Sequence, residues 1–200
     1  MRVSAHRVRE TLTTRFAKCL CSILLSLILV VGIILFILWI SLRPHRPRFH
    51  LAAFAIPGIA HPAGLAGSAI SFRVTDRNPN QDIGIYYGVI SGSVFYKNRL
   101  IASGSQVMSP FYQPPKNTTV IAGKVAGARI KAGSALATQL PGIAAGGRVE
   151  LRFELRSTIR FKVKVWDTHQ HNLHVECLVA VGSDGNILPE SKDIKCSIYF

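Results

Sequence analysis

Three histidines within six residues are the sequence feature closest to a metal site. His169, His171 and His174 lie in the segment DTHQHNLH, residues 167–174. A zinc site needs three or four ligands that converge at bonding distance, usually with a cysteine or carboxylate from elsewhere in the fold. This cluster falls in an expected hairpin loop, and a solvated loop explains it without a ligand. We therefore predict no metal site and no cofactor.

The motifs of common catalytic sites are missing from the sequence. It contains no G-x-S-x-G elbow, no P-loop, no H-E-x-x-H pair and no G-x-G-x-x-G turn. Serine, histidine and aspartate are present in number, but a catalytic triad is defined by its geometry and not by composition. The sequence predicts a protein that is not an enzyme and has no catalytic residues.

A row of basic residues is the strongest candidate for binding chemistry. The segment from Val149 to Val165 alternates apolar and polar residues with a period of two, the pattern of a half-buried strand. The basic residues of its polar face are Arg148, Arg152, Arg156, Arg160, Lys162 and Lys164. Glu150 and Glu154 interrupt them. The row is either a polyanion-binding face or a solvated face with cross-strand ion pairs, and the second interpretation needs no ligand.

The sequon and the cysteines offer sites of covalent chemistry. Asn117 begins the only N-glycosylation sequon, N-T-T, which would be used only in the secretory lumen. Cys177 and Cys196 are an even pair in the distal part of the chain, either a disulfide or two buried thiols. Cys19 and Cys21 lie at the inner end of an apolar segment. They are candidates for acylation, or two apolar residues in a bilayer.

The apolar segment predicts a membrane anchor. The chain has no charged residue from Leu20 to Leu42, and a helix of that length spans roughly 35 Å, enough for a hydrocarbon core of about 30 Å. We assign residues 1–18 to a basic tail and 19–42 to a transmembrane signal anchor. The run is too long for a cleaved signal peptide. The basic, hydroxyl-rich N-terminus leaves mitochondrial import as the second interpretation.

The charge distribution predicts the orientation and the class of partner. Five Lys/Arg precede the anchor and three follow it before Arg73, which favours a cytosolic N-terminus and an external C-terminal part. Removing the five Lys/Arg and one Glu of residues 1–42 from the chain's 24 basic and 10 acidic residues leaves about +10. A domain this basic favours acidic polysaccharide or anionic lipid as partners. Nucleic acid is excluded by an external location.

The sequence after the apolar segment predicts a β-rich domain. We interpret residues 43–65 as a stalk rich in proline and arginine, in which Phe49 to Ile56 could form a first strand. From Ile70 onward the alternation becomes regular. One short helix is expected over residues 134–140. Seven or eight short strands separated by turn residues predict an all-β, antiparallel sandwich over residues 66–200.

The turn Asn78-Pro79-Asn80 lies between two of these strands. A residue before proline is extended, and asparagine tolerates turn geometry, so these residues can hold the turn without a ligand. An outward contact with a partner is the alternative. The apolar alternation resumes at Ile83.

Three segments together resemble a known family. They are NPNQDIGIYYG (78–88), FYQPPKNTT (111–119) and KVKVWDTHQHNLHVEC (162–177). With the N-terminal anchor they resemble the plant harpin-induced, non-race-specific disease-resistance-like proteins. The resemblance implies a plant plasma-membrane protein with an external late-embryogenesis-abundant group 2 domain of immunoglobulin or fibronectin-like topology, linked to defence and stress. Gly88 and Pro114 depart from the family pattern, in which an acidic residue and a glycine are common.

These features leave three functions open. The leading hypothesis is a non-enzymatic, extracellular binding or signalling module in plant defence or stress, with a receptor-type protein as partner. The second is a structural tether between the membrane and acidic cell-wall polysaccharide. The third is a lipid-binding domain. Homo-oligomerisation is compatible with all three.

Overall fold

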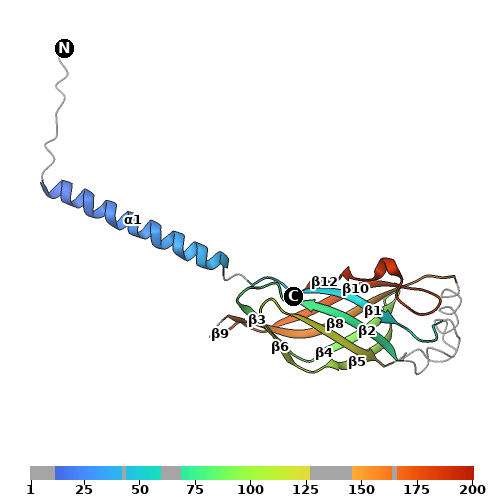
Figure 1. Cartoon of the computed structure of the whole chain (residues 1–200). Helices are drawn as coiled ribbons and strands as arrows, with labels where there is room; N and C mark the ends of the chain where they lie inside the picture. Colours follow the sequence, from blue (N-terminus) through green and yellow to red (C-terminus); the bar gives the residue numbers. More distant parts are fainter. Residues whose placement is uncertain (1–11, 42–43, 60–68, 127–145, 164–165) are drawn as a thin grey trace, which may run out of the picture. The chain divides into compact units, whose positions relative to one another are not determined.

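The computed structural model describes residues 12–41, 44–59, 69–126, 146–163 and 166–200. The chain divides into two compact units, Met1–Arg43 and Pro44–Phe200. In the first, α1 (Leu12–Ser41) is a continuous helix (Figure 1), and its part Thr14–Ile40 is long and apolar enough to cross a membrane. The helix begins before the expected anchor, because residues 12–18 contain no glycine or proline to stop it.

The second unit is built of two antiparallel sheets (Figure 1). In spatial order, the four-stranded sheet consists of β11 (Ile194–Lys195), β1 (Arg48–Ala55), β2 (Ile70–Arg77) and β7 (Thr118–Val125). The main path of the eight-stranded sheet is β12 (Ser197–Tyr199), β10 (His171–Val181), β8 (Val149–Val163), β3 (Ile83–Tyr87) and β6 (Phe111–Gln113). Off this path lie β4 (Ile90–Tyr96), β5 (Arg99–Met108) and β9 (Trp166–Asp167).

The expected antiparallel β-sandwich with one N-terminal helix is confirmed. The sheets hold more strands than the seven or eight expected, because β6, β9, β11 and β12 are two- or three-residue segments. The long strand expected from Val149 is β8, which ends at Val163. A 3-10 helix, η1 (Pro189–Ser191), follows β10. The helix expected over residues 134–140 lies outside the described residues.

The core fills the space between the two sheets. On β8, the odd-numbered residues from Val149 to Leu155 are buried, and the even-numbered residues between them are exposed or half-buried. The ring of Phe153 lies 5.6 Å from that of Phe54 and 4.7 Å from that of Phe72, measured between centroids. One side chain of the eight-stranded sheet thus packs on two from the other sheet. Burial of each such ring contributes about 1.5–3 kcal/mol.

The prediction that residues 43–65 form a stalk outside the β-domain is wrong. Residues 43–65 contain β1, which pairs with β2 and β11, so the β-domain begins near Pro44 and not at residue 66. The inward side chains Phe49, Leu51, Phe54 and Ile56 are all buried. Their spacing slips by one residue because the register with β2 shifts between Leu51 and Ala53. That bulge breaks the period of two on which the sequence pattern depends.

Candidate binding face

The three segments of the family resemblance become neighbouring strands. Tyr86 of β3 lies opposite Tyr112 of β6 on one side and Arg160 of β8 on the other. Lys162 of β8 lies opposite Gly84 of β3. Side chains of neighbouring, directly opposite residues share one face of a sheet. We call the surface formed by Tyr86, Tyr112, Arg160 and Lys162 the motif face.

The motif face combines aromatic rings with cations. The rings of Tyr86 and Tyr112 lie 4.7 Å apart, and the ammonium of Lys162 lies 5.5 Å and 5.6 Å from their centroids. Lys162 Nζ donates to the Tyr86 hydroxyl at 3.1 Å, and this hydrogen bond raises the pKa of Lys162. The guanidinium of Arg160 lies 5.9 Å from the Tyr86 ring. These contacts hold the cations over the rings at the protein surface.

Gly84 is required under Tyr112. A Cβ added at Gly84 would lie 2.2 Å from the Tyr112 hydroxyl oxygen, so any side chain there would displace the ring. The Tyr112 side chain nevertheless remains 42% exposed. The glycine therefore lets a large aromatic side chain lie flat across β3 while keeping one face in solvent.

An open groove of about 490 Å³ adjoins the motif face. Tyr86, Tyr112 and Arg160 line it together with Phe111 and Gln170. Phe111 stacks on Tyr87 with ring centroids 4.7 Å apart, which fixes the floor of the groove. Flat aromatic surfaces beside a guanidinium suit planar or ring-shaped groups that carry negative charge.

The two asparagines of the turn Asn78-Pro79-Asn80 are buried and do not belong to this surface, whereas Pro79 is half-buried. Asn78 Nδ2 donates to the Ile83 and Pro114 carbonyl oxygens at 2.9 Å and 3.1 Å. Asn80 exchanges two hydrogen bonds with the backbone of His45, at 2.7 Å and 2.9 Å. Both asparagines are at most 3% exposed. They connect the start of the β-domain to the loop before β7, and they are out of reach of a partner.

A buried carboxylate lies beside this turn. Asp76 is completely buried, and neither of its oxygens accepts a hydrogen bond of normal geometry. The nearby Tyr87 hydroxyl makes its hydrogen bond, at 3.4 Å, to Gln113 Oε1. Burial raises the pKa of Asp76 from 3.8 to about 7, and the Tyr87 hydroxyl offsets only part of that rise. Asp76 is therefore a neutral acid through much of the acidic range.

Sequence reasoning missed Asp76, although a signal was present. The inward positions of β2 are Ile70, Phe72, Val74 and Asp76. An acid at the fourth inward position of an apolar alternation predicts a buried carboxylate. Tyr112 and Gly84 were also missed, and no local signal indicates that they meet, because β3 and β6 are far apart in the chain.

The basic row of β8 divides into two parts. Arg148 pairs with Glu150 at 2.9 Å and with Glu190, while Arg152 and Arg156 pair with Glu154 at 3.1 Å and 3.0 Å. Exposed pairs of this kind contribute little stability, but they neutralise the face. Arg160 and Lys162 belong to the motif face instead. Lys164 lies outside the described residues.

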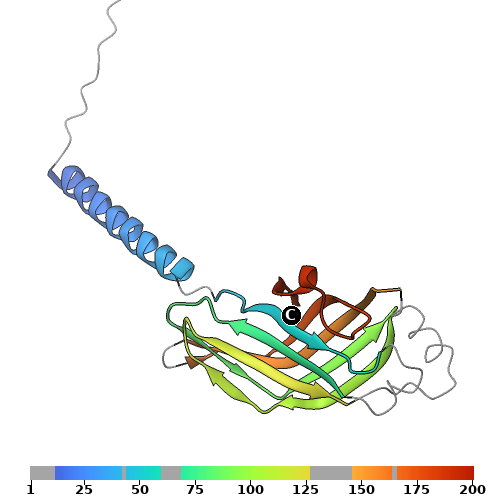
Figure 2. The ribbon, with the colours of Figure 1, turned by 45° about the vertical axis from the view of Figure 1, so that its right-hand side comes forward.

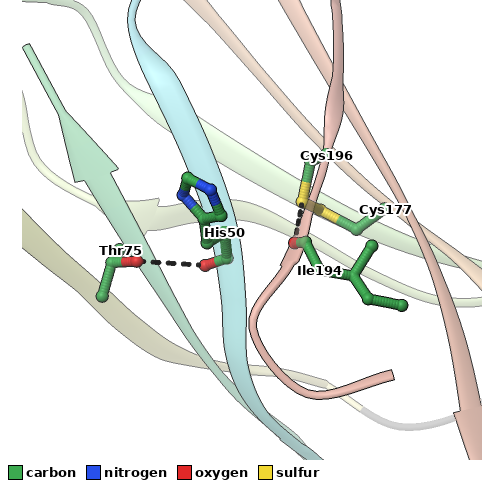
Figure 3. Close-up of a disulfide and its surroundings, with 5 residues drawn as sticks. All are labelled: His50, Thr75, Cys177, Ile194 and Cys196. Atoms are coloured by element: carbon green, nitrogen blue, oxygen red, sulfur yellow. Dashed lines mark hydrogen bonds between the residues drawn. A yellow bond between two sulfur atoms is a disulfide. The ribbon is translucent and has the colours of Figure 1, made fainter. Parts of the chain in front are cut away.

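The disulfide joins the chain where it crosses between sheets. Cys177 of β10 and Cys196, between β11 and β12, are bonded, with Cα atoms 4.5 Å apart (Figure 3). β11 belongs to the four-stranded sheet and β12 to the eight-stranded sheet. Cys196 Sγ also lies 4.0 Å from the Ile194 carbonyl oxygen. Because a disulfide sulfur carries no proton, this is a van der Waals contact.

The remaining sequence candidates are separate from these sites. His171 and His174 lie on β10, and within the described residues no three His, Cys, Asp or Glu side chains are grouped to hold a metal ion. The His171 ring lies 6.3 Å from that of Phe200. Cys19 and Cys21 are exposed, free cysteines of α1. Acylation at these two residues stays a prediction.

Glycosylation of Asn117 is expected. Asn117 is exposed in the turn before β7, where its side chain accepts a hydrogen bond from the Thr118 amide at 2.8 Å. Treatment of the protein expressed in plant cells with peptide-N-glycosidase should shift its mobility, and Asn117→Gln should abolish the shift. Asn98→Gln, in another exposed turn without a sequon, is the control and should keep it. An unmodified Asn117 peptide in mass spectra of the plant protein would contradict the prediction.

An apolar helix joined to a two-sheet β-domain is the architecture of a membrane-anchored protein with one β-sandwich. The chain belongs to the family described as "Late embryogenesis abundant protein", whose profile matches residues 73–177, just over half of the chain. It is 28% identical over 183 residues to "Protein NDR1" of Arabidopsis thaliana, covering 88% of this chain and 80% of that protein. It is 30% identical over 163 residues to "NDR1/HIN1-like protein 12" of the same plant, covering 80% and 77%.

Among solved structures, the solution structure of AT1g01470 from Arabidopsis thaliana aligns with a TM-score of 0.42 and 14% identity. The alignment covers 70% of this chain and 83% of that one. The sequence relatives and the N-terminal apolar helix fit a membrane-anchored plant defence protein. The resemblance inferred from the three segments is thereby confirmed.

Proposed function

We propose that this protein is a single-pass plasma-membrane protein whose β-sandwich is a non-enzymatic binding module in plant defence or stress signalling. The N-terminus is cytosolic and the β-sandwich is extracellular. The observation that carries the proposal is the motif face, where three segments distant in sequence come together as adjacent strands. They expose aromatic rings and cations instead of burying them in the core.

The chemistry of the motif face is that of recognition and not of bond breaking. Tyrosine and arginine are enriched among the residues that dominate binding energy at protein interfaces. The buried polar residues near it, Asn78 and Gln113, are used for hydrogen bonds within the fold. A receptor-type membrane protein that presents an acidic segment to Arg160 and Lys162 is the partner that fits this surface.

Co-purification from plant membranes tests the binding role. A tagged full chain should retain its partner, and Tyr112→Ala combined with Lys162→Gln should lose most of it, because both changes remove the exposed motif face without emptying the core. Leu178→Ala combined with Lys192→Gln, both exposed elsewhere, is the matched control and should retain it. If the two double variants capture the same proteins in the same amounts, the motif face is not the binding surface. A second copy of this chain among the captured proteins would indicate self-association.

The second candidate function is a tether to acidic cell-wall polysaccharide. The net charge of about +10 on residues 43–200 favours it. A lipid-carrying role is the least supported of the three, because the rings of Phe54, Phe72 and Phe153 fill the space between the sheets that a carried acyl chain would need.

A further inference from the structure

The outer face of the four-stranded sheet carries a second set of cations. They come one or two from each strand and are all exposed: Arg48, Arg73, Arg77, Lys124 and Lys195. We call this set the cationic strip. β1, β2 and β7 lie side by side in the sheet (Figure 2), so residues from three distant parts of the sequence share one surface. Sequence patterns within a single strand do not show it.

The pairing registers give the strip its shape. Arg48 lies opposite Arg77, and Lys195 lies opposite His50 in the next outward row. Arg73 follows further along β2, and Lys124 lies opposite Ser71 near its start. The rows of Arg77 and Lys124 are six residues apart on β7, which is roughly 20 Å at about 3.4 Å per residue. The charges are therefore arranged along a line and not around a single point.

The strip lacks carboxylate partners. Within the described residues of the β-domain, the ion pairs involve Arg148, Arg152 and Arg156, all on β8 or just before it in the other sheet. The outward positions described on the four strands hold no Asp or Glu, since Asp76 of β2 points into the core. The turn before β11 contributes one acid, Asp193. Unlike the basic row of β8, this face keeps its positive charge.

The arrangement is unfavourable without a ligand. Arg48 and Arg77 are directly opposite on antiparallel strands, a position in which like charges destabilise a sheet. Arg77 offsets part of this by donating to Thr118 Oγ1 at 3.2 Å. A bound polyanion would remove the repulsion, so binding is favoured both by the new attraction and by relief of the old repulsion.

An open groove of about 560 Å³ continues the strip at one end. Arg46, Arg48 and Lys195 line it, together with residues that include Pro79 and Tyr199. The guanidinium of Arg46 is held over the Phe200 ring at 4.9 Å. The strip therefore leads into a hollow that presents three cations, which a flat patch of surface charges would not provide.

We infer that the cationic strip and its groove bind a linear polyuronate, an acidic polysaccharide with a carboxylate on each sugar. A line of cations matches a line of carboxylates better than it matches one phosphate group. On the strip, a membrane surface fits less well, because surface-binding elements insert large apolar side chains, and Val120 is the one large apolar residue exposed on the described outward positions of β1, β2 and β7. Exposed Ile194, Tyr199 and Phe200 lie on β11 or at the groove, so the vesicle arm of the test decides there. This inference rests on the proposed extracellular location and gives the tether its ligand.

The test uses the full-length chain in nanodiscs of neutral lipid, produced without glycosylation. Binding to immobilised polygalacturonate should weaken as salt rises and should vanish with fully methyl-esterified polymer, which keeps the sugar backbone and loses the charge. The triple variant Arg73→Gln, Arg77→Gln, Lys195→Gln should bind about tenfold more weakly or worse. The control Arg99→Gln, Arg148→Gln, Arg156→Gln removes as many charges from the other sheet and should stay within about twofold of the parent protein. Equal unfolding temperatures show that all three proteins are folded.

Three results would overturn the inference. Equal losses in both triple variants would mean that only net charge is sensed. No binding of the parent protein to polygalacturonate would remove the ligand, while partner capture through the motif face would still report on the proposed binding function. Stronger binding to vesicles of anionic phospholipid than to polygalacturonate, lost in the strip variant alone, would make a membrane surface the ligand of this face.

Discussion

Asp76→Asn is expected to stabilise the protein more at high pH than at low pH. Its effect on the free energy of unfolding should be roughly 3 to 4 kcal/mol more favourable above pH 7 than near pH 4. The reason is the buried carboxylate of Asp76, whose pKa burial raises from 3.8 to about 7. An amide of the same shape never ionises. The substitution therefore removes the need to bury a negative charge that no hydrogen bond of normal geometry compensates.

The sign of the pH dependence follows from proton counting. Between pH 3.8 and about 7 the native protein holds a proton on Asp76 that the unfolded chain has already released. Stability in this range must therefore fall as the pH rises, and the stability contributed by the protonated Asp76 is completely lost above the folded pKa. A carboxylate whose pKa is lowered on folding would give the opposite slope.

Thermal unfolding of the full chain in detergent, followed from pH 4 to 8.5, measures this effect. The parent protein should lose stability across the range, and Asp76→Asn should be nearly flat. Asp184→Asn is the control, because hydrogen bonds from Asn186 lower the pKa of Asp184 and place its titration below this range. A parent protein whose unfolding temperature does not change between pH 5 and 7.5 would show that Asp76 is ionised or solvated in the fold.

The sequence predicted the elements that depend on one strand at a time. The alternation from Val149 onward predicted β8, and the alternation from Ile70 onward predicted β2, because a half-buried strand has a period of two. The first strand suggested from Phe49 to Ile56 is confirmed as β1, but the period of two does not hold along it, because the bulge after Leu51 changes which parity faces the core. The bulge depends on pairing with β2, and pairing is not written in the local pattern.

The two charged surfaces show the same limit of prediction from the local sequence. The sequence drew attention to β8 because its basic residues are close together in the chain, yet three of them are paired with glutamates. The cationic strip draws Arg48, Arg77 and Lys195 from three strands, and only the register of the sheet reveals their proximity. The motif face likewise depends on β3 lying between β6 and β8. Non-local pairing decides which side chains meet.

Loss of the disulfide between Cys177 and Cys196 is expected to lower the free energy of unfolding by roughly 3 kcal/mol, since the bond closes a loop between residues 19 apart in sequence. The substitution Cys177→Ala with Cys196→Ala should show this loss, with a small further cost because both side chains are buried. Reductant should lower the unfolding temperature of the parent protein and leave that of the double variant unchanged.

Cys19→Ser with Cys21→Ser is the matched control, because these free cysteines lie in α1 and should not alter the response of the β-domain to reductant. Peptide mapping of the plant protein under non-reducing conditions then reports the bond itself. Alkylation of both Cys177 and Cys196 without prior reduction would show two thiols and would remove one support for an extracellular domain, since disulfides persist in oxidising compartments. A cysteine pair that resists alkylation until it is reduced would show the disulfide and support an extracellular domain. It would place the crossing from β11 to β12, with Lys195 of the cationic strip beside it, in a segment fixed by a covalent bond.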